Sequence, residues 1–143
     1  MLIRPARLDD EASLRAADAS MSPWEFSLDL APDEPFTSWL ARREGEEAGD
    51  VPAGRVPAAF RVAEVNGVVV GRSSIRFALN VWLAQYGGHV GYGVLPEHRG
   101  KGIATLLLRD SLSLLRPHVA DALVACTMGT PRQRQSPNAA AAC

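Results

Sequence analysis

The sequence lacks several features that mark common classes of protein. It has no excess of one charge, with 15 Lys and Arg against 16 Asp and Glu, so the basic stripe typical of nucleic-acid-binding proteins is missing. No apolar run approaches the roughly 18 residues that a membrane span requires, and the charged N-terminus is unlike a signal peptide. We therefore expect a cytoplasmic protein with no nucleic-acid partner and no membrane partner.

Cysteine is scarce as well. Only Cys126 and Cys143 occur among the 143 residues, and their spacing fits neither a disulfide framework nor a metal site. We therefore expect no metal. Hydrophobic residues (47%) and charged residues (22%) are present in the proportions of an ordinary globular domain, so the chain has enough apolar residues for one buried core.

Apolar periodicity and turn residues predict a succession of strands and helices. Asn66-Gly67 between two Val-rich runs is a strong hairpin signal, and Pro96 ends a later β-like run. Asp9 or Asp10 is placed to cap the first helix. We predict strands over residues 2–5, 58–65, 68–79, 87–95 and 121–127, and helices over residues 12–19, 36–47 and 102–116.

Two stretches depart from this pattern. Five prolines interrupt the mostly acidic residues 22–57. This stretch is either a surface excursion or a flap over the substrate, because long loops in compact domains are often functional. Residues 127–143 show neither helical nor strand periodicity, and their composition predicts a disordered tail.

Residues 99–102, Arg-Gly-Lys-Gly, lie directly before an apolar helix. A helix N-terminus offers unpaired N–H groups and the positive end of the helix dipole, so this loop suits an anion. The Walker phosphate-loop pattern fails because Gly102 stands where Ser or Thr is required. The dinucleotide-binding pattern that begins at Gly91 and Gly93 fails because Pro96 stands at its third glycine.

A third glycine-rich pattern fits. Residues 99–104, Arg-Gly-Lys-Gly-Ile-Ala, match Arg/Gln-x-x-Gly-x-Gly/Ala between a proline-ended strand and an amphipathic helix. They resemble the pyrophosphate loop of the GNAT superfamily of acetyl-CoA-dependent N-acetyltransferases, and the resemblance extends over residues 1–126. It implies a GNAT N-acetyltransferase domain with an α+β fold, in which helices flank a mixed, mainly antiparallel sheet.

The resemblance also implies the substrates and the residues that bind them. Acetyl-CoA is the expected co-substrate, and the acceptor is an amine of a small molecule or peptide. The strand that ends at Val94-Leu95 is expected to diverge from the strand at residues 123–126 and to pair with the pantetheine amides. The Val94 N–H is the expected oxyanion donor. The expected cofactor-binding residues are Val94, Leu95, Arg99, Gly100, Lys101, Gly102, Ile103, Ala104 and Thr105.

The resemblance leaves the catalytic side chains unassigned. His89 is the best candidate for a base, since histidine titrates near neutral pH, although a single strand histidine is more often structural. Three other candidates are expected to be ordinary surface carboxylates: Asp33, Glu34 and Glu97. Many GNAT enzymes place a tyrosine acid on the helix after the fifth strand, whereas Tyr86 and Tyr92 are the only tyrosines here.

The resemblance ends after the fifth strand. A further helix and two strands have no counterpart, so we expect an incomplete domain with a bare sheet edge at residues 123–126 and self-association through that edge. The chain is then either an active N-acetyltransferase or an inactive, truncated fragment that at most binds CoA. We also hypothesise a change of reading frame after Cys126, because restoring one base is compatible with a string that resembles the Asp-x-x-Asn and Glu-x-x-Gly-Gly segment of these enzymes.

Overall fold

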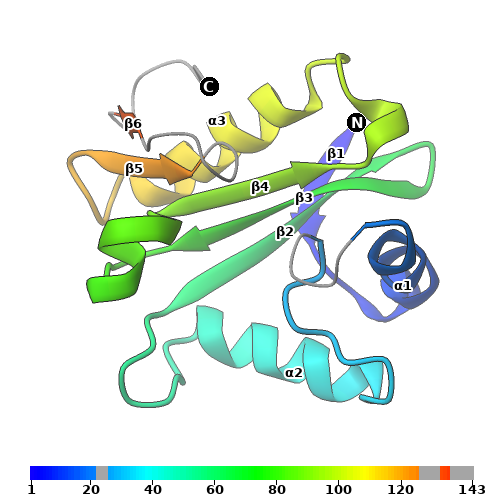
Figure 1. The fold of residues 1–143 in the computed structure, drawn as a ribbon, viewed down its shortest axis with the longest axis horizontal. Coiled ribbons are helices and arrows are strands. Elements are labelled where there is room, and N and C mark those ends of the chain that lie inside the picture. Colours follow the sequence, from blue (N-terminus) through cyan, green and yellow to red (C-terminus); the bar gives the residue numbers. More distant parts are fainter. Residues whose placement is uncertain (22–25, 126–132, 136–143) are drawn as a thin grey trace.

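The computed structural model describes residues 1–21, 26–125 and 133–135. They form a six-stranded sheet in the order β1-β2-β3-β4-β5-β6, with helices on both faces (Figure 1). The strands are β1 (Leu2–Pro5), β2 (Ala58–Val65), β3 (Val68–Arg76), β4 (Val90–Val94), β5 (Ala122–Ala125) and β6 (Gln133–Gln135). The helices are α1 (Glu11–Ser20), α2 (Phe36–Glu47) and α3 (Ile103–Leu115), with shorter helical turns η1 (Leu8–Asp10), η2 (Leu83–Gly87) and η3 (Pro96–His98).

Neighbouring strands are antiparallel except for β4 and β5, which are parallel. This confirms the predicted α+β fold with a mixed, mainly antiparallel sheet. In the β2–β3 hairpin, Asn66 (φ +51°) and Gly67 (φ +79°) both have positive φ, as a two-residue hairpin turn of type I′ requires. β3 ends at Arg76, earlier than the predicted end at residue 79.

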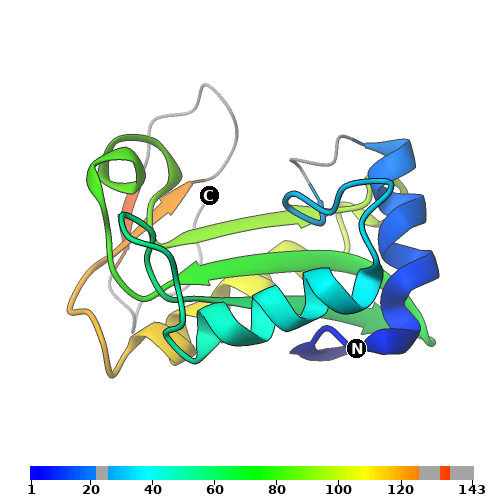
Figure 2. The same cartoon turned by 90° about the horizontal axis from the view of Figure 1, so that it is seen from below.

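α1 and α2 cover one face of the sheet. Figure 2 shows α2 running along the strands and α1 crossing them near one end. Trp39 is fully buried in this layer: its ring stacks on Phe36 with centroids 5.3 Å apart and meets Phe60 edge-on at 5.2 Å. The part of residues 22–57 that forms α2 therefore belongs to the core and is not a surface excursion. That the loops around it cover a substrate stays a prediction.

α3 covers the opposite face. Alternate residues of a strand point to opposite faces; Phe60 of β2 packs with α1 and α2, whereas Ala59 packs with α3. Gly71 of β3 lets α3 approach closely, since an added Cβ would lie 3.1 Å from Leu107 Cδ1 and 3.2 Å from the Gly93 carbonyl. No helix in the described ranges combines the length and the apolar character needed to span a bilayer.

Asp10 differs from the predicted helix cap. It stands before α1, but its carboxylate makes no bond to a helix amide. It accepts hydrogen bonds from Nη1 and Nη2 of Arg4 and from the Arg7 N–H, each at 2.8 Å. Burial would raise the pKa of this carboxyl, but the hydrogen bonds from Arg4 and Arg7 outweigh it and hold the pKa below its usual range. The carboxylate thus fastens β1 to the start of α1.

β6 differs from the prediction of a disordered tail over residues 127–143. Its residues Gln133–Gln135 pair antiparallel with β5. Pairing with an existing sheet edge orders a segment whose own composition carries no strand signal. The edge expected to be bare is therefore paired at residues 122–124. The rest of the tail, including the proposed change of reading frame, lies outside the described residues; the domain boundary at residue 126 and self-association stay predictions.

Candidate functional site

β4 and β5 pair over a short distance only. In the described part of the chain β5 pairs with Val90 and Gly91 of β4, and β4 extends past the end of β5 (Figure 1). The Leu95 N–H donates to a β3 carbonyl at 2.9 Å, and since antiparallel pairing alternates, the Val94 N–H points away from β3. Within the described ranges, residues 92–94 thus present a backbone edge with no strand beside it.

The loop after β4 is shaped by two glycines. Gly100 (φ +77°) and Gly102 (φ +82°) lie in the left-handed region, which residues with a Cβ rarely adopt. An added Cβ at either position would meet no atom within 4 Å. Glycine is therefore required at these positions for its backbone conformation and not because neighbouring atoms leave no room. The space beside the loop is open.

The amides of this loop form the most distinctive feature of the site. No group in the described part of the chain accepts a hydrogen bond from the N–H of residues 100–105. The first amide of α3 with a partner is that of Leu106, which donates to the Gly102 carbonyl at 3.2 Å. Unpaired amides at the positive end of a helix dipole bind phosphate groups well. This arrangement suits an anion with several oxygen atoms.

The two cations of the loop differ in their contacts. Arg99 Nε donates to the Val94 carbonyl at 3.0 Å, so this side chain ties the loop to the end of β4. Lys101 is exposed and forms no ion pair with any described residue. Arg99 therefore positions the backbone, while Lys101 is open to solvent and to ligands.

The other residues expected to bind the cofactor contribute backbone groups. The side chains of Leu95 and Ile103 are buried on opposite faces of the sheet, and Ala104 is half-buried against the α3 core. Thr105 is exposed on the first turn of α3. The structure thus brings the expected residues together around one loop and one strand end, where Arg99, Lys101 and Thr105 have exposed side chains.

His89 joins three strands. Its backbone N–H donates to the Leu123 carbonyl at 2.7 Å, and its carbonyl accepts from the Arg76 N–H at 2.7 Å. Its Nδ1 accepts a hydrogen bond from the Leu123 N–H at 3.0 Å, so this nitrogen carries no proton. Gly88, with φ +65°, permits the close approach, since an added Cβ would lie 2.7 Å from the Leu123 carbonyl oxygen. This geometry favours the structural role of His89 over that of a base.

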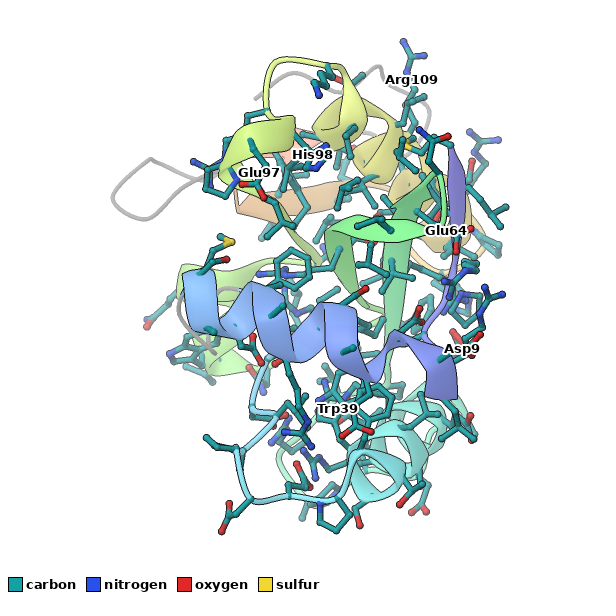
Figure 3. All side chains as sticks on the ribbon, turned by 90° about the vertical axis from the view of Figure 1, so that its right-hand side faces the viewer. Asp9, Trp39, Glu64, Glu97, His98 and Arg109 are labelled. Carbon is teal, nitrogen blue, oxygen red and sulfur yellow. The ribbon has the colours of Figure 1, made fainter. Side chains whose placement is uncertain are left out.

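The remaining catalytic candidates are not gathered at the site. Asp33 and Glu97 are exposed, as expected of surface carboxylates, and Glu97 lies with His98 on the turn after β4 (Figure 3). Tyr92 is half-buried, and burial raises the pKa of its hydroxyl. The side chain of Tyr86 lies outside the described residues. No group of three His, Cys, Asp or Glu side chains that could hold a metal occurs in the described ranges.

Sequence reasoning missed two arginines that face the middle of β4. An added Cβ on Gly91 would lie 3.2 Å from Arg76 Nη1 and 3.8 Å from Arg72 Nη1. Both arginines come from the face of β3 that carries α1 and α2, because Gly71 next to Arg72 faces α3. The sequence does contain a signal for them: the two arginines lie four residues apart on one predicted strand, and the neighbouring strand carries glycines.

Comparison with known proteins decides the family. A family model described as "Acetyltransferase (GNAT) family" matches residues 15–135. The chain belongs to this family. The resemblance seen in the loop and its flanking elements is thereby confirmed, and so is the enzyme class, an acetyltransferase of the GNAT family. A search of curated proteins gave no significant match.

Solved structures share the fold of this acetyltransferase. A ribosomal-protein-alanine N-acetyltransferase from Brucella melitensis is 21% identical with a TM-score of 0.57, over 90% of this chain and 76% of that one. An N-acetyltransferase from Staphylococcus aureus Mu50 is 22% identical with a TM-score of 0.54, over 86% and 70%. A GNAT family acetyltransferase from Brucella melitensis in complex with acetyl-CoA is 22% identical with a TM-score of 0.53, over 99% and 90%. At such identities the likeness concerns the fold.

Proposed function

We propose that this enzyme transfers the acetyl group of acetyl-CoA to a primary amine of a small molecule or peptide, in the cytoplasm. The observation that carries the proposal is the close succession of two backbone features: the edge of residues 92–94 and the amides of residues 100–105, neither of which is paired within the described part of the chain. A diphosphate suits the amides, and the amides of a pantetheine arm suit the strand edge. A protein of the same fold is known in complex with acetyl-CoA, which supports this donor.

Each part of the loop has a role in this proposal. Gly100 and Gly102 give the backbone the left-handed turns that direct successive amides to one side. Residues 103–105 add the first-turn amides of α3, and the exposed Thr105 adds a hydroxyl. Lys101 adds a positive charge. Each interaction at a helix end contributes roughly 0.3–1 kcal/mol, so affinity requires several of them together.

Val94 lies at the proposed reaction centre. Acetyl-CoA supplies a thioester; the amine nitrogen bonds to its carbonyl carbon, the C–S bond breaks, the nitrogen loses a proton and the sulfur gains one. The Val94 N–H is proposed to donate to the oxyanion formed on the way, a contribution typically worth about 3–4 kcal/mol. Arg99 and the buried Leu95 hold this strand end in place.

The alternative function is that of an inactive protein that at most binds CoA. The observation that favours it is the hydrogen bond from the Leu123 N–H to His89 Nδ1, which occupies the best candidate base. This function shares the loop with the first but lacks turnover.

Binding and turnover measured side by side test both functions. Acetyl-CoA at about 100 times its dissociation constant stabilises a protein by roughly 2.7 kcal/mol, which appears as a rise in melting temperature. Thiol release from acetyl-CoA is followed in parallel against a panel of amines. Binding with amine-dependent release supports the proposed transfer, and binding without release supports the alternative. A folded protein that shows no thermal shift with acetyl-CoA overturns the assignment of the donor.

A further inference from the structure

The two faces of β4 differ in the side chains that the strand presents. On the α3 face, Val90 and Val94 are buried, and Tyr92 packs against the same core. On the opposite face β4 carries only Gly91 and Gly93 in its middle. A thioester that reaches the middle of β4 therefore meets no β4 side chain on the face that carries α1 and α2. An acceptor amine must approach on that face.

Arg72 and Arg76 occupy this same face. Their Nη1 atoms lie 3.8 Å and 3.2 Å from the Cβ position of Gly91, so the two nitrogens are at most about 7 Å apart. Arg72 is 7% exposed. Two guanidinium groups from one strand thus converge on the middle of β4 at Gly91, with Arg72 buried and Arg76 half-buried.

We infer that Arg72 and Arg76 bind a carboxylate carried by the acceptor, so that the substrate is an amine with a carboxylate group close to its nitrogen. The inference rests on the function proposed above and narrows its acceptor. A planar guanidinium presents paired N–H groups that match the two oxygens of a carboxylate. Both arginines also contact the protein, and five N–H donors on each allow a carboxylate to share them.

The charge of Arg76 is retained at neutral pH. Burial lowers the pKa of Arg76 to about 10, which leaves its guanidinium protonated at neutral pH. Arg72 beside it is buried, and a guanidinium in such surroundings attracts an anion more strongly than it would at the surface. The attraction also places the amine: Arg72 lies opposite Gly93 in the sheet register, so a carboxylate held there leaves a nitrogen a few bonds away near Gly93 and Val94.

A purely structural role for the two arginines makes a different prediction. In that case removal of either charge lowers the free energy of unfolding and slows transfer to all amines alike. A substrate-binding role changes the choice between acceptors. The ratio of kcat/KM for a carboxylate-bearing amine to that for its carboxamide separates the two roles, because the two acceptors differ only in the group that the arginines would hold.

The first arm of the test uses the wild-type protein alone. Free amino acids, a peptide with an acidic residue next to its N-terminus, and the carboxamide of each are compared as acceptors with acetyl-CoA. We expect the carboxylate form to be preferred roughly 10- to 100-fold, the effect of hydrogen bonds to a charged group. Equal kcat/KM for carboxylate and carboxamide overturns the inference while the proposed transfer stands. The comparison of amino acids with the peptide tells which source of carboxylate is used.

The second arm uses Arg72→Gln and Arg76→Gln. We expect each to remove most of the preference by raising KM for the carboxylate acceptor, with the Kd for acetyl-CoA unchanged. Arg72→Lys, which keeps the charge but not the paired N–H groups, should restore part of it. Arg109→Gln, on the exposed outer side of α3 (Figure 3), is the matched control and should keep the full preference. A preference that survives in both folded Gln variants overturns the inference.

A third arm keeps the inference testable if no amine is acetylated. That result overturns the proposed transfer. Calorimetric titration of the amino acid and of its carboxamide into the CoA-loaded protein then tests whether Arg72 and Arg76 bind a carboxylate. Binding of the carboxylate form that is lost in Arg76→Gln supports them as an anion site. Equal binding of both forms, or binding of neither, overturns the inference.

Discussion

The loop at the start of α3 and the β3–β4 face around Gly91 would recognise their proposed ligands by different means. The loop offers backbone amides held in place by Gly100 and Gly102, whereas the β3–β4 face offers the side chains of Arg72 and Arg76. A backbone site accepts any side chain that permits its conformation, so it suits a donor shared across a family. A side-chain site changes with one substitution, so it suits an acceptor that differs from one enzyme to the next.

The largest effect is expected when a substitution distorts the loop and leaves the β3–β4 face unchanged. Gly102→Val forces a β-branched residue into φ +82°, so we expect affinity for acetyl-CoA to fall by about 100-fold or more, removing the roughly 2.7 kcal/mol of ligand stabilisation. Thermal shift with increasing acetyl-CoA measures this. Gly54→Val is the matched control, since Gly54 has φ +85° and equally open surroundings. Loss of affinity in both variants would mean that general strain is the cause.

A smaller effect is expected when the β3–β4 face is disturbed and the loop is left alone. Gly91→Ala places a Cβ 3.2 Å from Arg76 Nη1, and the flexible guanidinium must move by a few tenths of an ångström. We expect roughly a tenfold rise in KM for a carboxylate acceptor, with the Kd for acetyl-CoA unchanged. Steady-state kinetics and calorimetry measure the two quantities. An unchanged KM would show that Arg76 does not set the acceptor position.

Arg99 connects the two regions, so its removal sharpens the comparison. Arg99→Gln removes the hydrogen bond from Nε to the Val94 carbonyl, a contribution of about 0.5–1.5 kcal/mol. We expect a larger fall in kcat than in affinity for acetyl-CoA, because the strand end at the reaction centre loses its support. A fall confined to affinity would mean that Arg99 acts on the bound diphosphate directly.

The smallest effect is expected at Lys101. This exposed cation contributes charge without a partner among the described residues, so Lys101→Gln should weaken acetyl-CoA binding by only about two- to fivefold. The difference from wild type should shrink at high salt, since exposed charges are screened. Titrations at low and high ionic strength check both statements. A loss of affinity as large as that expected for Gly102→Val would show that the Lys101 side chain, and not the loop backbone, contributes most of the binding of acetyl-CoA.

The features that sequence predicted are local ones. The Asn66-Gly67 turn, the bounds of α2 and the glycine-rich loop each depend on residues within a few positions of one another. The features that it missed join distant residues. His89 finds its partner in Leu123, and Arg72 and Arg76 meet Gly91 only through the register of β3 with β4. β6 has no strand signal of its own, since its order comes from pairing with β5.

The short contact between β4 and β5 has a consequence for how the molecule opens. Two register pairs, together with the hydrogen bonds between His89 and Leu123, form the described seam between β4 and β5. By contrast, β2 and β3 pair from end to end, with one bulge at Val70. Cooperative units of a protein separate where the fewest bonds must break. The β5–β6 pair is therefore expected to detach before the β1–β4 sheet unfolds, and its amides to exchange with deuterium first. Acetyl-CoA bound along the edge of residues 92–94 would bridge that seam, and protection of β5 would then report occupancy of the site.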